Sequence, residues 1–173
     1  KLSITNQITL VSFEKIMPPS SLISELKEHG VNWKFISFGR NGIFGGILRF
    51  VRLLRFIPSS GIIHARSDIA AFAAVLRGSN KVIWDCRALM ADHRRSLSAS
   101  TYHRVQAFFF LAMERIIAIR SEKIIVITQA VIPILESRYS LPQKKFHHIS
   151  TCVDVIKFRP SSLRVIGEES IRI

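Results

Sequence analysis

Short apolar runs recur along the chain, and longer segments with apolar residues at helical spacing separate them. Each run has four to six residues, the length of a strand buried in a sheet. The predicted strands are residues 8–13, 33–38, 62–65, 82–85, 124–128 and 148–152. Their spacing predicts repeated strand–helix–strand units.

The segments between the strands carry the signals that begin and end helices. Ser20 or Ser21 can cap a helix that Gly30 ends, and Ser67 with Asp68 can cap another. The predicted helices are residues 21–29, 43–57, 68–77, 102–119 and 129–139, the last with Pro133 in its first turn, where proline is tolerated.

Strands that alternate with helices in this way are typical of a parallel sheet covered on both faces. We therefore predict an α/β domain with a doubly wound, Rossmann-like sheet in three layers. The length of 173 residues suits one domain, which we assign to residues 1–160. Residues 161–173 look like a hinge and the start of another unit. Residues 93–100 are polar and rich in serine, which predicts a surface loop.

The formal net charge of +13 favours anionic partners such as phosphate-bearing substrates, lipid headgroups or nucleic acid. We expect no nucleic acid, because no binding motif is present and the phenylalanines occupy core-like helical positions.

The apolar run 107–113 is too short to span a membrane, and residues 1–10 do not resemble a signal peptide. Cys86 and Cys152 stand far apart without a disulfide or zinc pattern, which predicts a cytoplasmic setting.

Ionisable residues follow two neighbouring predicted strands at the point where each ends. Asp85 and Arg87 end the fourth strand, and His64 and Arg66 end the third. Because the carboxyl ends of parallel strands face the ligand crevice, these residues are the first candidates for a site. One interpretation is that Asp85 accepts hydrogen bonds from sugar hydroxyls and Arg87 orients it or binds phosphate. The alternative is an ion pair that only holds the loop.

Other kinds of chemistry lack their motifs. The turn after the first strand has no glycine, so a dinucleotide site is not expected, and no G-x-S-x-G nucleophile elbow is present. His93, Arg94, Arg95 and His103 have no metal-ligand spacing, so we expect no metal. This run, His93 included, is expected to line the mouth of the crevice.

Arg49, Arg52 and Arg55 recur every three residues on a helix that is otherwise apolar. They could form the solvated face of a crossover helix. Alternatively, they form a basic surface that rests on anionic lipid headgroups at the inner face of the cell membrane.

Five segments of the chain carry a recognisable pattern. They are SFE after the first strand, HARSDIAAFAA after the third, WDCRALMADHR after the fourth, VITQAVIPIL after the fifth and ISTCVDVIKFRP near the end. Taken in order, they resemble the amino-terminal half of a family 4 glycosyltransferase, a retaining enzyme of the two-domain GT-B architecture. The last is the most specific and resembles the family's I-P-x-x-V-D-x-x-x-F-x-P passage into its second domain. The family's usual Asp-Glu pair after D-x-R-G is replaced here by Asp92 and His93, and the glycine-rich first loop is missing.

The resemblance implies that this chain is the acceptor-side half and that the nucleotide-sugar donor binds mainly to a second domain beyond Pro160. It implies no further cofactor. The partners would be a nucleotide sugar and a saccharide or lipid-linked acceptor. Asp85 would be the catalytic residue, with Glu14 and Lys15 on the opposite lip of the cleft. Two other functions stay open: a basic module that binds anionic membrane or nucleic acid without chemistry, and a sugar-nucleotide epimerase of the same architecture.

Overall fold

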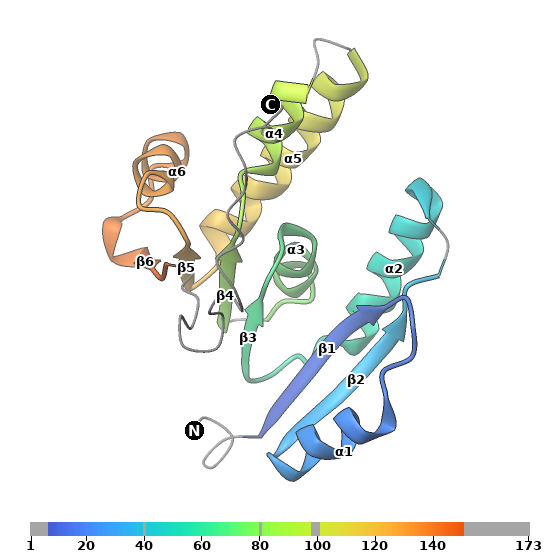
Figure 1. Ribbon diagram of the computed structural model, residues 1–173. Coiled ribbons are helices and arrows are strands. Elements are labelled where there is room, and N and C mark those ends of the chain that lie inside the picture. Colours follow the sequence, from blue (N-terminus) through green and yellow to red (C-terminus); the bar gives the residue numbers. More distant parts are fainter. Residues whose placement is uncertain (1–6, 40, 80, 98–100, 151–173) are drawn as a thin grey trace, which may run out of the picture.

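The structure is a computed structural model that describes residues 7–39, 41–79, 81–97 and 101–150 (Figure 1). Its strands are β1 (Ile8–Glu14), β2 (Val31–Ser37), β3 (Ile62–Ala65), β4 (Lys81–Cys86), β5 (Lys123–Val126) and β6 (Phe146–His148). Its α-helices are α1 (Ser20–Glu28), α2 (Gly42–Phe56), α3 (Asp68–Leu76), α4 (Met90–Leu97), α5 (Thr101–Arg120) and α6 (Val131–Tyr139), and a 3₁₀ turn, η2 (Gln143–Lys145), precedes β6.

All the strand pairs are parallel, and helices flank the strands, which confirms the predicted α/β, Rossmann-like class. The strands are hydrogen-bonded into two groups, β1–β2 and β3–β4–β5–β6, rather than into one continuous sheet. Side chains join the groups, because Val11 and Phe13 of β1 pack against an apolar cluster that includes Leu53 of α2 and Val82 of β4. The two groups therefore share an apolar core.

The main core lies on one face of the four-stranded sheet. Trp84 and Cys86 of β4 pack there with Ala71 of α3, Ile117 of α5 and Leu135 of α6. Because side chains alternate along a strand, Asp85 lies on the opposite face from Trp84 and Cys86. α1 lies on the other side of the β1–β2 pair from α2 (Figure 1). Right-handed crossovers place the helices in this way, since α1 connects strands in one direction across the sheet and the later helices in the other.

Helix ends follow the sequence signals in part. The Ser67 hydroxyl caps α3 by accepting a hydrogen bond from the Ala70 amide, and Gly30 adopts a positive φ of 75° after α1, as expected for a residue that ends a helix. The predicted serine cap of α1 is wrong. Pro19 occupies that position, and no side-chain hydrogen bond caps this helix.

The predicted surface loop at residues 93–100 is also wrong over most of its length, because α4 extends to Leu97. One side of this short helix packs along α5, with Ala91 fully buried and the Arg94 guanidinium over the Phe110 ring. Most of its remaining residues are polar and face solvent, which makes the sequence look like a loop. The sixth strand begins two residues earlier than predicted, at Phe146.

Several predictions lie outside the described residues. These are the strand residues 151 and 152, Cys152, the boundary at residue 160 and the hinge at 161–173.

Candidate functional site

The carboxyl ends of β3 and β4 bring three of the predicted residues together. The Asp85 carboxylate, 3% exposed, lies 2.9 Å from Nε of Arg87 and accepts a 3.0 Å hydrogen bond from its Nη2. Nε2 of His64 lies 3.5 Å from the same carboxylate. His64 and Arg87 are much more exposed, at 56% and 39% of their side chains. The buried carboxyl group of Asp85 therefore lies beside a guanidinium and an imidazole at the edge of the sheet, and we call Asp85, Arg87 and His64 the Asp85 rim.

The other predicted substrate residues do not join the Asp85 rim. Arg66 follows β3 and is exposed, and His93 is exposed on α4. Glu14 ends β1 in the other strand group, and Lys15 follows it. The Phe38 amide donates to the Glu14 carbonyl, and the Lys15 ammonium lies 5.5 Å from the Phe38 ring centroid. Within the described residues, none of these four side chains forms a hydrogen bond or an ion pair with Asp85.

The three arginines of α2 do not share one exposed face. Arg49 turns inward, with its guanidinium 4.0 Å from the Phe38 ring centroid and a 3.1 Å hydrogen bond to the Phe38 carbonyl. Arg52 is half-buried near Gly39, and Arg55 is exposed. The outward face of the helix instead carries apolar side chains, which are Phe44, Ile47, Leu48 and Val51.

Sequence reasoning missed a buried polar network behind the rim. The fully buried Glu114 of α5 accepts hydrogen bonds from the Arg138 guanidinium at 2.9 Å and the Tyr139 hydroxyl at 2.7 Å, both on α6. Arg138 also donates to both carboxylate oxygens of Asp92 on α4. Burial raises the pKa of Glu114, while these hydrogen bonds oppose the shift. An acidic residue inside an apolar helix was the available signal, because such a group needs a partner.

A second buried acid lies at the start of α3. The Trp84 indole donates a 3.1 Å hydrogen bond to Asp68, and burial raises the pKa of Asp68 from 3.8 to about 6. The neighbouring Cys86 thiol is buried, which raises its pKa above that of a free thiol, so it is a poor nucleophile. Asp68 and Cys86 are both buried and therefore belong to the interior rather than to the exposed edge of the sheet.

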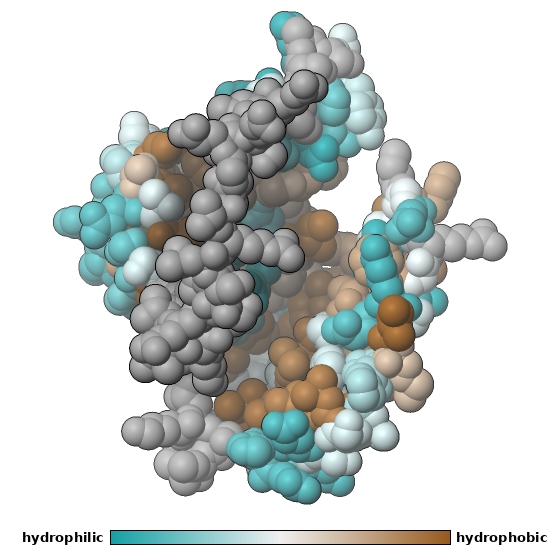
Figure 2. Space-filling model, viewed as in Figure 1, coloured by the Kyte–Doolittle hydropathy of each residue, from teal (hydrophilic) through white to brown (hydrophobic). Residues whose placement is uncertain are grey.

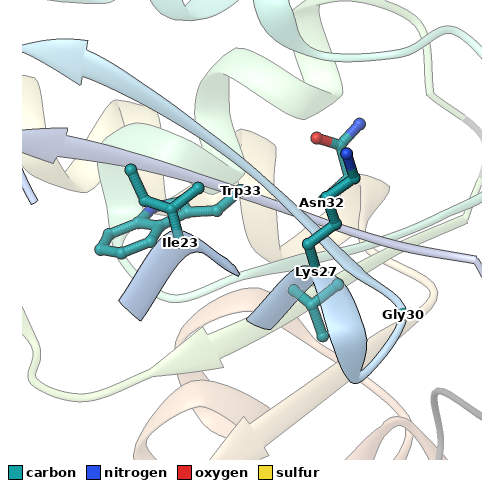
Figure 3. A pocket seen from close by; sticks show the side chains of 6 residues that line it. Ile23, Lys27, Gly30, Asn32 and Trp33 are labelled. Atoms are coloured by element: carbon teal, nitrogen blue, oxygen red, sulfur yellow. The ribbon is translucent and has the colours of Figure 1, made fainter. Parts of the chain in front are cut away.

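The surface around these elements is uneven. In the view of Figure 2, apolar residues gather in a hollow at the middle of the molecule, and hydrophilic residues lie below it and on its right-hand side. A separate shallow pocket lies at the amino-terminal edge of β2, lined by α1 and by β2 residues such as Asn32 and Trp33 (Figure 3). That pocket is at the opposite edge of the strands from the Asp85 rim.

Two further features bear on ligands. Among the described residues, no three His, Cys, Asp or Glu side chains gather in a way that could hold a metal ion. Within the same part of the chain, no helix combines the length and apolar character needed to cross a membrane.

No protein-family model matches the chain, and a comparison with curated proteins finds no match either.

Proposed function

We propose that this domain is the acceptor-side half of a retaining glycosyltransferase that moves a sugar from a nucleotide sugar to a saccharide or lipid-linked acceptor. The observation that carries the proposal is the rim of Asp85, Arg87 and His64 at the carboxyl edge of a parallel sheet. Ligands of doubly wound domains bind at this edge. The motifs HARSD and WDCRA, which resemble the glycosyltransferase family, supply these residues.

The proposed roles follow from burial. Asp85 is too enclosed to meet a sugar over much of its surface, so it acts as a positioning residue that fixes Arg87 and His64. Arg87 keeps part of its guanidinium exposed and can bind an anionic group of the acceptor or the leaving diphosphate. His64 can hydrogen-bond a sugar hydroxyl. Arg66 and Lys15, both exposed, add positive charge near the cleft.

Catalysis requires stabilisation of charge that develops in the transition state. As the sugar leaves the nucleotide, negative charge grows on the diphosphate while the sugar becomes cation-like. In this proposal the donor binds mainly to a second, nucleotide-binding domain, and the Asp85 rim completes the cleft between the two domains. The apolar hollow in Figure 2 suits a surface that closes on a ligand and a second lobe.

The test uses the protein in which this domain is joined to its nucleotide-sugar-binding half. Arg87→Gln and Asp85→Asn are each expected to lower kcat/KM for transfer by about 10- to 100-fold, the effect of losing a charge-assisted hydrogen bond. Arg77→Gln is the matched control, because Arg77 is exposed at the end of α3, near the opposite edge of the sheet. Wild-type kcat/KM in both rim variants would reject the proposal.

The positioning role of Asp85 has its own readout. If Asp85 acts through Arg87, the double variant Asp85→Asn with Arg87→Gln should lose little more activity than Arg87→Gln alone. If the fold loss of kcat/KM in the double variant instead equals the product of the losses in the two single variants, Asp85 contacts the substrate directly, as the sequence predicts.

A further inference from the structure

The outward side of α5 exposes a continuous apolar surface. Phe108 and Phe109 are 72% and 74% exposed, which is unusual for residues of this size. They belong to a set that we call the α5 ridge, made up of Tyr102, Val105, Phe108, Phe109, Ile116 and Ile119. Most members recur at intervals of three or four residues, so they lie on one side of a helix about 30 Å long.

The other sides of α5 already have partners. Ala107, Ile117 and Ala118 are buried, and α4 packs along the helix beside Phe110. The ridge is therefore a second apolar face that the described fold leaves uncovered. An exposed patch of this kind marks an interaction surface.

Three arginines accompany the ridge. Arg104 and Arg115 lie along one border and Arg120 lies at its end, and all three are exposed. Within the described part of the chain, none of their side chains makes a hydrogen bond or an ion pair. Their charges add to a chain that is strongly basic overall, at +13.

We propose that the α5 ridge docks on the surface of an anionic lipid bilayer. Aromatic and aliphatic side chains would enter the boundary between headgroups and acyl chains, and the bordering arginines would contact the headgroups. A second copy of this chain fits less well, because an interface formed by two ridges would bring two sets of unpaired arginines together. Tyr102, at the start of the ridge, is an aromatic residue of the kind enriched at membrane interfaces.

α2 is less suited than α5 to an anionic lipid surface. α2 also exposes apolar residues, but Arg49 is turned to Phe38 and Arg52 is half-buried, so only Arg55 is exposed beside them. The charge complementarity with a lipid surface is therefore stronger at α5. This proposal does not rest on glycosyl transfer, because binding to a bilayer needs no sugar donor.

Co-sedimentation of the full chain with vesicles tests the proposal. We expect binding to phosphatidylcholine vesicles that contain phosphatidylglycerol, weaker binding without it, and loss of binding at high salt. Phe108→Ser with Phe109→Ser should weaken binding by about tenfold or more, because each phenylalanine buries apolar surface in the bilayer. Phe44→Ser with Ile47→Ser removes exposed apolar residues from α2 and should change binding less than twofold, roughly within the scatter for surface substitutions.

Fluorescence gives an independent readout. Tryptophan introduced as Phe108→Trp should shift its emission to the blue and be quenched by brominated lipids, whereas Phe44→Trp should not. Unchanged vesicle binding by the α5 double variant, or quenching of Phe44→Trp alone, would overturn the proposal. A concentration-dependent dimer that only the α5 double variant loses would also overturn it and assign the ridge to a second copy.

Discussion

Arg138 on α6 donates two hydrogen bonds, of 3.0 and 2.8 Å, to the carboxylate of Asp92 on α4, although 46 positions separate them in the sequence. The other end of the same guanidinium binds the buried Glu114 of α5. One side chain thus joins three helices behind the Asp85 rim. A buried ion pair adds little net stability by itself, but removing one partner is costly, since it leaves a charge buried without compensation.

Arg138→Ala is therefore expected to lower the free energy of unfolding by about 3–5 kcal/mol, measured by urea denaturation. Adding Glu114→Gln should restore part of the loss, because a neutral amide costs less to bury than a carboxylate. Arg104→Ala, at an exposed position of α5, serves as the control and should change stability by less than about 0.5 kcal/mol. A loss below about 1 kcal/mol in Arg138→Ala would show that the network does not hold the helices together.

The buried carboxyl group of Asp68 should make the stability of the fold depend on pH. Burial raises its pKa from 3.8 to about 6 in the folded chain, so between these values the folded state keeps a proton that the unfolded state has released. The contribution of Asp68 to the free energy of unfolding therefore falls as the pH rises through that window, by roughly 3 kcal/mol in total.

Asp68→Asn removes the ionisation and keeps an oxygen that can accept the Trp84 hydrogen bond. The variant should match the wild type near pH 3.5 and be more stable by roughly 3 kcal/mol at about pH 7. Chemical denaturation of both proteins across this pH range measures the difference between their free energies of unfolding. The other titrating groups are the same in both proteins, so their contributions cancel in this difference. A difference that does not vary with pH would contradict the assignment.

The arginines of α2 should differ in their effect on stability. Arg49→Ala removes the contact with the Phe38 ring and the hydrogen bond to its carbonyl, and should cost about 1–2 kcal/mol. Arg55→Ala removes an exposed side chain of the same helix and should cost less than about 0.5 kcal/mol. Equal losses in thermal or chemical denaturation would mean that the Phe38 contact carries no energy.

Local signals in the sequence were sufficient for most of the elements. Ser67 caps the helix it was expected to cap, and the apolar runs at β1, β3 and β4 are strands because their side chains suit a sheet buried by helices. α4 was missed, since its stability comes from packing along α5 rather than from an apolar pattern of its own. The split between β2–β1 and the other four strands also had no local signal.

The sequence by itself predicted that Asp85, Arg87, His64 and Arg66 lie at one edge of the sheet, because residues that end adjacent parallel strands share that edge. Only the tertiary structure decided which of these side chains are buried and which of them contact one another. In the folded chain the Asp85 carboxylate is buried, while Arg87 and His64 are exposed. Arg49 points inward to Phe38, whereas Phe108 and Phe109 face outward. Burial and contacts between distant segments depend on how whole helices pack, and spacing along the chain does not specify that.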